Sequence, residues 1–174
     1  DKNRGYGAAI KTGIKNATKD LIFYTDGDGQ YDPREMALFL PLMTADIDVV
    51  NGFKMVRKDP WYRILIGNIY NILVKIMFGL QMKDVDCDFR LFRREIFDDM
   101  ELESDSGVIC VEMMKKIQDA GYRMREVSVH HYNREHGVSQ FFNFPRIWAT
   151  GMGLLKQWWK LVLKKSTSLE RLKT

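Results

Sequence analysis

Cysteine is scarce in this sequence, and long apolar runs are missing. The 174 residues include two cysteines, Cys87 and Cys110, which form neither a C-x-x-C pair nor a metal-ligand pattern with histidines. A disulfide framework and a zinc site are therefore not expected, and a reducing compartment is the default. The two most apolar segments, 61–82 and 147–163, are interrupted by Lys, Arg, Asn or Gln. Neither predicts a membrane-spanning helix, which needs about 18 consecutive apolar residues or more.

A broad basic surface is also lacking. The chain has 27 Lys and Arg against 23 Asp and Glu, a net charge of +4. Six of the basic residues and only one acidic residue lie in 156–174, which leaves 21 basic and 22 acidic residues in the remainder. The positive charge therefore belongs to the C-terminal segment, and this distribution argues against a nucleic-acid partner. A composition of 45% hydrophobic and 29% charged residues is typical of an ordinary globular domain.

The first half of the chain predicts alternating helices and strands. Residues 8–18 are expected to form a helix, and the apolar run 21–25 a short, buried parallel strand. Asp32, followed by Pro and a Glu three residues on, is typical of a helix start, so a helix is predicted over about 34–43. Residues 48–52 then predict another strand. This alternation indicates an α/β sheet.

The second half predicts three more helices and one strand. Residues 61–79 have a helical apolar pattern ending at a glycine, and 106–120 a second one closed by Gly121. A strand is expected over 124–132, and a last helix can begin at Pro145. The apolar stripe of the first of these helices comprises Trp61, Leu65, Ile69, Leu73, Ile76 and Met77. That of the last comprises Trp148, Met152, Leu155, Trp159 and Val162, beside a stripe of lysines at 156, 160 and 164.

Three acidic residues and an amide follow the first strand directly, in the run T-D-G-D-G-Q-Y-D-P at 25–33. Asp32 is explained by helix capping, whereas Asp26 and Asp28 cap nothing in the expected structure. Like charges this close repel each other unless a cation offsets them. Oxygen ligands at the carboxyl end of a sheet strand suit a hard cation such as Mg²⁺ or Mn²⁺.

A calcium-binding EF-hand loop is the obvious rival, because it also begins with Asp at positions one and three. It is excluded here, since position six would be Tyr31 where glycine is needed and position twelve Ala37 where Glu is needed. A strand also precedes the run where a helix should.

The run resembles the DxD motif of family 2 glycosyltransferases with the GT-A fold, in the DxDxQ form of the polyprenyl-phosphate glycosyltransferases such as dolichyl-phosphate mannose synthase. Four further segments are similar to motifs of that family and follow in the same order. They are N-R-G-Y-G-A at 3–8, G-F-K-M-V-R-K-D at 52–59 with Arg63, D-V-D-C-D-F-R-L-F-R at 84–93, and R-E-H-G-V-S at 134–139.

The resemblance implies an inverting transfer of a hexose from a GDP- or UDP-sugar to a polyprenyl phosphate, assisted by Mg²⁺ or Mn²⁺. An ionised acceptor phosphate needs no catalytic base. The resemblance implies Asp28 as the first metal ligand, with Asp26 and Gln30 in support. The implied donor-diphosphate contacts are Arg134, Ser139 and Arg90. The implied acceptor-phosphate contacts are Lys54, where the family usually has Arg, together with Arg57 and Arg63.

Two other functions stay open. A transferase of the same fold that acts on a glycan hydroxyl would need a base, for which Asp84, Asp86 and Asp88 are the candidates. A non-catalytic fragment is the other, because the family normally begins with two nucleotide-binding strands and this chain has no predicted strand before its first helix. We therefore expect an N-terminally truncated catalytic domain over 1–140.

Residues 141–174 are expected to form an amphipathic, basic helix and tail. An apolar face with tryptophans beside a lysine stripe is typical of a helix lying in a bilayer interface, although packing onto the core is the alternative. The helix at 61–79 has the same two interpretations. A lipid-phosphate acceptor would favour a peripheral position at the cytoplasmic face of a membrane.

Three polar side chains are given ordinary roles. His130 and His131 lie on a predicted strand without a third metal ligand, and they are expected to be strand histidines. Glu112 could approach the site or serve packing.

Overall fold

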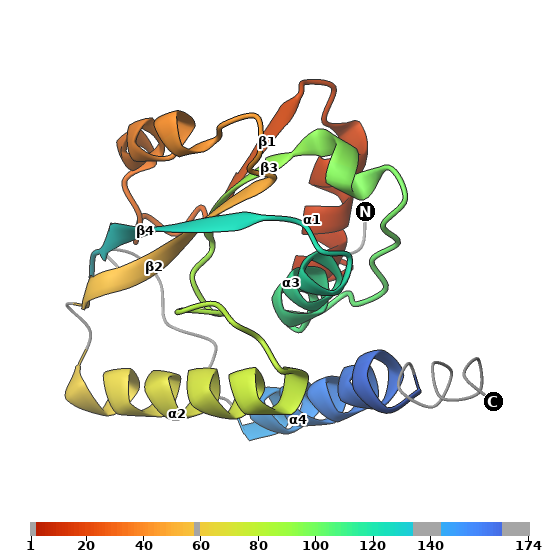
Figure 1. The fold of residues 1–174 in the computed structure, drawn as a ribbon. Coiled ribbons are helices and arrows are strands. Elements are labelled where there is room, and N and C mark those ends of the chain that lie inside the picture. Colours follow the sequence, from red (N-terminus) through yellow and green to blue (C-terminus); the bar gives the residue numbers. More distant parts are fainter. Residues whose placement is uncertain (1–2, 58–59, 134–143, 165–174) are drawn as a thin grey trace.

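A four-stranded sheet organises the described part of the protein (Figure 1). The computed structural model describes residues 3–57, 60–133 and 144–164. The strands lie in the order β1-β3-β2-β4. Their bounds are Leu21–Thr25 for β1, Val49–Arg57 for β2, Phe89–Arg93 for β3 and Met124–His131 for β4.

The sheet is mixed, because β3 runs antiparallel to both of its neighbours while β2 and β4 are parallel. The prediction that β1 is a buried parallel strand is therefore wrong. β1 stands at the end of the sheet, its residues are half-buried, and its partner in the described part of the chain is antiparallel β3. The strand β3 was not predicted, since its F-R-L-F-R sequence is only five residues long and does not alternate strictly between apolar and polar residues.

Helices α1 (Tyr6–Asn16) and α3 (Ile109–Asp119) cover one face of the sheet, and α2 (Trp61–Phe78) and α4 (Phe144–Trp158) form a further layer beneath it (Figure 1). The π-helical turn η4 (Trp159–Lys164) continues α4. One core cluster joins these elements. It includes Val49 and Phe92 from the sheet, Val74 and Phe78 from α2, Met113 and Ile117 from α3, and Leu154 from α4. No helix among the described residues meets the length and hydropathy that crossing a membrane requires.

Two short 3₁₀ segments, η1 (Pro33–Leu38) and η2 (Leu40–Leu42), lie on the opposite face. The helix predicted over 34–43 is therefore wrong in type, because Pro41 has no N–H to donate in a continuing α-helix. The predicted cap is confirmed, since the Asp32 side chain accepts from the Arg34 N–H at 2.9 Å. Between the two segments, Phe39 is fully buried with its ring centroid 5.0 Å from that of Phe89.

The predicted helix ends are confirmed where glycine takes a left-handed conformation. Gly79 follows α2 with φ of 63°, and Gly121 follows α3 with φ of 81°. A residue with a side chain adopts such angles at a cost, so these two positions stop the helices where the sequence places them.

Candidate active site at one edge of the sheet

Two carboxylates from distant parts of the sequence meet at one edge of the sheet. Thr25, the last residue of β1, is paired with Phe89, the first residue of antiparallel β3. Asp26 therefore leaves β1 at the point where Asp88 enters β3. The register of these two strands brings together residues that are 62 positions apart.

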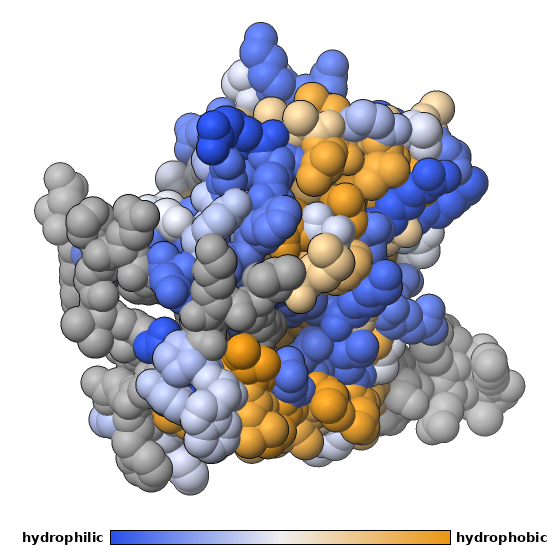
Figure 2. Space-filling view, turned by 90° about the vertical axis from the view of Figure 1, so that its left-hand side faces the viewer, coloured by the Kyte–Doolittle hydropathy of each residue, from blue (hydrophilic) through white to orange (hydrophobic). Residues whose placement is uncertain are grey.

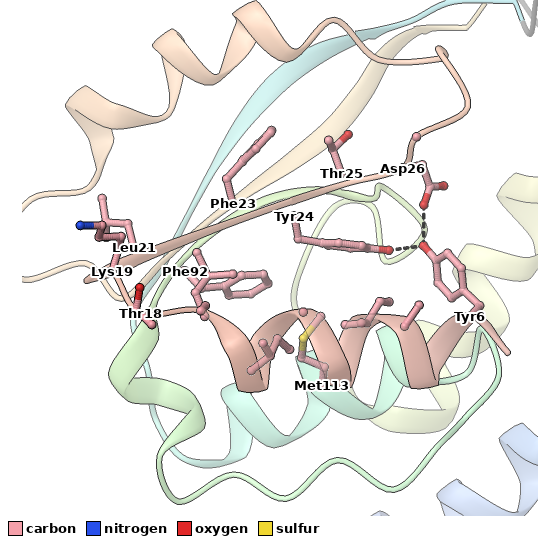
Figure 3. Close-up of a pocket in the computed structure, with 17 residues that line it drawn as sticks. Tyr6, Thr18, Lys19, Leu21, Phe23, Tyr24, Thr25, Asp26, Phe92 and Met113 are labelled. Carbon is pink, nitrogen blue, oxygen red and sulfur yellow. Dashed lines mark hydrogen bonds between the residues drawn. The ribbon is translucent and has the colours of Figure 1, made fainter. Parts of the chain in front are cut away.

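The phenol of Tyr6 joins the two carboxylates. Its hydroxyl lies 2.7 Å from Oδ1 of Asp26 and 3.1 Å from Oδ2 of Asp88, and it also contacts the hydroxyl of Tyr24 (Figure 3). Burial and the neighbouring carboxylates raise the pKa of Tyr6 above its ordinary value of 10.0. Tyr6 thus stays protonated, and its single O–H lies within hydrogen-bond distance of both carboxylates, with the shorter distance to Asp26.

Two glycines hold Tyr6 in this position. The Gly7 N–H donates to the Asp105 carbonyl at 2.9 Å, and a Cβ at Gly7 would lie 2.4 Å from the Ser104 carbonyl oxygen. Gly5 has φ of 101°, and a Cβ there would lie 2.5 Å from the Asp105 oxygen. No side chain fits so close to a backbone. The G-Y-G sequence is thus explained by the packing of the α1 N-terminus against 104–106.

Asp88 is held by three groups. Besides Tyr6, it accepts from the Cys110 Sγ at 3.3 Å and lies 3.8 Å from Nη2 of Arg90. Cys110 is buried, and this burial, together with the Asp88 charge, raises its thiol pKa well above the ordinary value. A neutral thiol therefore donates to the carboxylate.

The surroundings of Asp26 disfavour its ionised form. Burial, followed by the charge of Asp88, raises the pKa of Asp26 from 3.8 to about 6, and the hydrogen bond from Tyr6 opposes that shift. The charges of Asp28 and Asp86 act in the same direction as Asp88. The excess of negative charge at this edge is what a cation would relieve.

Asp28 and Gln30 also have local structural roles that the sequence did not predict. Oδ1 of Asp28 accepts from the Gln30 N–H at 3.0 Å, which closes a turn, so Asp28 does hold a backbone donor. The Gln30 side chain is buried, and its Nε2 donates to the Tyr132 carbonyl at 3.1 Å. The Tyr132 N–H returns a bond to the Gln30 carbonyl at 2.8 Å. These bonds fix the acidic loop to the end of β4.

Arg90 is fully buried, which the donor-diphosphate assignment did not anticipate. Its Nε donates to Oδ1 of Asn51 at 2.9 Å and its Nη2 to the Val85 carbonyl at 2.6 Å, while Nη1 has no partner among the described residues. Because Arg90 is the ion-pair partner of Asp88, it helps to hold this carboxylate at the edge of the sheet. In the structure as it stands, it is not exposed to a ligand.

Lys54 lies between two carboxylates of the loop that precedes β3. Its side chain is 6% exposed, and its Nζ is 3.7 Å from Asp84 and 3.6 Å from Asp86. Nζ also donates to the Asp86 carbonyl. Its charge is therefore balanced by these carboxylates, and of the three candidate bases only Asp86 is exposed, at 54% of its side chain.

The remaining predicted contacts are less defined. Arg63 lies half-buried in the first turn of α2, and Arg57 is the last residue of β2, with its side chain outside the description. Arg134 and Ser139 lie outside the described residues.

Glu112 has a structural role. It is fully buried on α3 and accepts from the Glu103 and Ser104 N–H groups at 2.8 and 2.9 Å, and it pairs with Lys116 at 2.7 Å. His130 is bound to Glu35 at 2.9 Å, as an ordinary strand histidine would be.

A cavity of about 530 Å³ opens between α1 and β1, and the carboxylate edge lies at one end of it (Figure 3). Tyr6, Tyr24 and Asp26 line that end, and Thr18 and Lys19 line the other. Sequence reasoning missed Tyr6 and the pairing of Asp26 with Asp88. The available signal was the position of Tyr6 between two glycines in the N-R-G-Y-G-A motif at 3–8.

The ligand set fits a hard cation in kind, since Asp26, Asp28 and Asp88 offer only oxygen atoms as ligands. Within residues 3–57, 60–133 and 144–164, no three His, Cys, Asp or Glu side chains are already gathered as a metal site.

Comparison with known proteins points to one family. The family model described as "Glycosyl transferase family 2" matches residues 1–101, more than half of the chain. Among solved structures, glucosyl-3-phosphoglycerate synthase from Mycobacterium tuberculosis is similar in three complexes. The complex with UDP has a TM-score of 0.64 at 12% identity, covering 90% of this chain and 54% of that one. The complex with Mn²⁺, UDP and phosphoglyceric acid gives 0.65 and 14%, covering 90% and 53%. The complex with Mn²⁺ and UDP-glucose gives 0.63 and 13%, covering 90% and 54%.

These likenesses show the fold. The mixed α/β sheet matches GT-A glycosyltransferases, as the sequence predicted, and the chain spans about half the length of the structures that it matches.

Proposed function

The chain belongs to glycosyl transferase family 2, and from that premise we propose that it transfers a hexose from a nucleotide diphosphate sugar to the phosphate of a polyprenyl lipid. The observation that carries the proposal is the anionic edge formed by Asp26 and Asp88 around Tyr6. The resemblance of residues 26–30 to the DxD motif of the family implies that the metal and the nucleotide diphosphate bind at this edge. The similar structures were solved with UDP or UDP-glucose and with Mn²⁺ or Mg²⁺, which supports a nucleotide sugar and a divalent metal here.

Asp26 and Asp28, with Gln30 in support, would hold Mg²⁺ or Mn²⁺, and Asp88 is a further carboxylate at the same place. The ion supplies charge neutralisation to the departing diphosphate. Ionisation of Asp26 is opposed by burial in the structure as it stands, and a bound cation favours the ionised form. Tyr6 orients the carboxylate pair from the α1 side.

The chemistry at the sugar needs no proton transfer. An oxygen of the acceptor phosphate forms the new bond to the anomeric carbon, and the bond from that carbon to the nucleotide diphosphate breaks, with its electron pair leaving on the nucleotide. A cationic side chain must hold the acceptor phosphate beside the donor phosphates. Lys54, Arg57 and Arg63 are proposed for the acceptor, and Arg134, Ser139 and Arg90 for the donor. Since Lys54 and Arg90 are engaged by carboxylates, both would have to change partners on binding.

A hydroxyl acceptor is the second candidate. Asp86 favours it, because this carboxylate is 54% exposed and its charge acts on Asp26, so it is the candidate base at this edge. The similar synthase, which was solved with phosphoglyceric acid, gives a concrete small acceptor to test.

The experiment compares acceptors. Radiolabelled UDP-glucose or GDP-mannose is incubated with the chain and Mn²⁺, together with a short, water-soluble polyprenyl phosphate, phosphoglyceric acid or a free oligosaccharide. Label in the polyprenyl phosphate supports the proposal. Label in phosphoglyceric acid or the oligosaccharide alone transfers the assignment to the hydroxyl acceptor. In that case Asp86→Asn should abolish the transfer.

A further inference from the structure

Helix α2 is apolar on the side that faces away from the core. Only Val74 and Phe78 of this helix are buried, whereas its outward hydrophobic side chains are between 40% and 76% exposed. These outward residues are Trp61, Tyr62, Leu65, Ile66, Ile69, Ile72, Leu73 and Ile76. An ordinary surface helix shows the reverse arrangement, with its apolar side turned inward.

Helix α4 and the first residue of η4 present a similar face. Leu154 and Gln157 are buried, and the outward hydrophobic side chains are between 46% and 67% exposed. They are Ile147, Trp148, Met152, Leu155 and Trp159. The two helices lie in one layer beneath the sheet (Figure 1), and hydrophobic side chains gather in that lower part of the molecule (Figure 2). We call these thirteen side chains the α2–α4 surface.

The charged residues of these helical segments have one sign. None of the chain's 23 acidic residues lies in α2, in α4 or in η4. The same segments hold Arg63, Lys75, Arg146, Lys156, Lys160 and Lys164. Among these, Lys160 pairs with Glu103 from outside the layer. Segments that contribute apolar and basic side chains, and no acidic ones, are complementary to a layer that is anionic outside and apolar inside.

We propose that the α2–α4 surface docks into the interface of an anionic lipid bilayer, with both helices lying in the membrane plane. Amphipathic helices with aromatic residues on one face and Lys or Arg beside it bind this way, through apolar burial and attraction to acidic headgroups. Tryptophan is enriched at the membrane–water interface because its ring is apolar and its N–H is polar. Four of the thirteen side chains are Trp or Tyr.

A direct link connects this surface to the candidate active site. On the inward side of α2, the Asn71 Nδ2 donates to the Lys83 carbonyl at 2.9 Å, and its Oδ1 accepts from the Val85 N–H at 3.1 Å. The segment that Asn71 holds continues through Asp86 to Asp88. Docking of α2 therefore fixes the carboxylate edge relative to the membrane. The inference deepens the proposed function and rests on it only for the lipid acceptor.

The test is co-sedimentation of the chain with vesicles that contain neither polyprenyl phosphate nor donor. Phosphatidylcholine vesicles with phosphatidylglycerol are expected to bind the chain, and pure phosphatidylcholine vesicles to bind it less. Ile76→Glu, at a position 75% exposed, should weaken binding by about tenfold or more, since it replaces an aliphatic side chain that docking would bury with a charged one. Lys156→Glu should weaken it by about fivefold for each unit of charge lost, and added salt should reduce that difference.

Matched controls lie off this surface. Leu38→Glu changes a half-exposed residue on η1, and Lys15→Glu reverses a charge on α1; both should bind vesicles as the wild type does. No binding to the anionic vesicles, or equal binding by all four variants, would overturn the proposal. The proposal would also be overturned if the wild type did not bind vesicles but self-associated in solution, and if Ile76→Glu abolished that self-association. The α2–α4 surface would then join copies of the chain. Transfer to the water-soluble acceptor is measured separately, so docking and catalysis fail independently.

Discussion

Removal of the Asp26 charge should stabilise the folded chain at neutral pH when no divalent metal is present. The pKa of Asp26 rises from 3.8 to about 6 on folding, chiefly because the carboxylate is buried and lies beside Asp88. That difference corresponds to at most about 3 kcal/mol, and partial exposure of the group to water reduces it. Asn keeps an oxygen that can accept from Tyr6, so Asp26→Asn removes the charge and spares the hydrogen bond.

The raised pKa of Asp26 also predicts how the stability difference between Asp26→Asn and wild type changes with pH. A carboxyl whose pKa is raised by folding contributes its stability below about pH 3.8 and loses it as pH rises through about 6. The advantage of Asp26→Asn over wild type should thus be near zero at pH 3.8 and largest above pH 6.

The assay is urea unfolding in EDTA at a series of pH values between these limits, with Asp99→Asn as an exposed control that should change stability little. A variant that is less stable than wild type at pH 7, or an advantage that does not grow with pH, would refute the electrostatic reasoning. Addition of Mn²⁺ should then stabilise the wild type more than Asp26→Asn, since only the wild type keeps both carboxylates at this edge.

Three further substitutions test other parts of the structure. Tyr6→Phe removes a hydrogen bond that lowers the pKa of Asp26, so an NMR titration should find a higher pKa for Asp26 than in the wild type. An unchanged pKa would contradict the hydrogen bond between Tyr6 and Asp26. Gly7→Ala should destabilise the fold by about 2 kcal/mol or more in thermal unfolding because its Cβ meets a backbone oxygen, whereas Gly13→Ala in the same helix has open space and should stabilise it by up to about 1 kcal/mol. Glu112→Gln should destabilise the chain by about 3 kcal/mol at pH 7. Burial raises the pKa of Glu112, but its hydrogen bonds outweigh burial and lower the pKa below 4.5, so the ionised carboxylate stabilises the fold above pH 4.5 and loses this effect as pH falls below that value. A destabilisation that persists unchanged at low pH would contradict this account.

Local signals in the sequence were sufficient for most single elements. Gly79 and Gly121 end their helices through a left-handed backbone, and Asp32 caps a helical start with its own side chain. These features depend on a few neighbouring residues, so they can be inferred without knowledge of the fold.

The features that the sequence did not predict depend on contacts between distant segments. The antiparallel placement of β1 follows from pairing of 21–25 with 89–93, which no local pattern encodes. The closeness of Asp26 and Asp88 is a consequence of that register. Arg90 illustrates the same limit. The motif at 84–93 predicts a contact between Arg90 and the donor diphosphate, but the side chain is fully buried and bonded to Asn51.

For a similar reason, the sequence does not decide whether the apolar face of α2 packs onto the core or lies in a bilayer interface. Periodicity identifies the apolar stripe of 61–78 but not the direction in which it points. Packing of Val74 and Phe78 into the core turns Leu73 and Ile76 outward.

The most direct test of the central claim is Mn²⁺-dependent transfer of labelled sugar to the short polyprenyl phosphate by wild type, Asp28→Asn and Asp28→Ala. Asn retains the turn bond to the Gln30 N–H and removes only the charge, whereas Ala removes both. The account predicts labelled lipid from the wild type and none from either variant, while Asp28→Asn keeps wild-type unfolding behaviour. Transfer by Asp28→Asn at the wild-type rate, or wild-type transfer that persists in EDTA, would contradict the assignment of this edge as the metal-assisted transferase site.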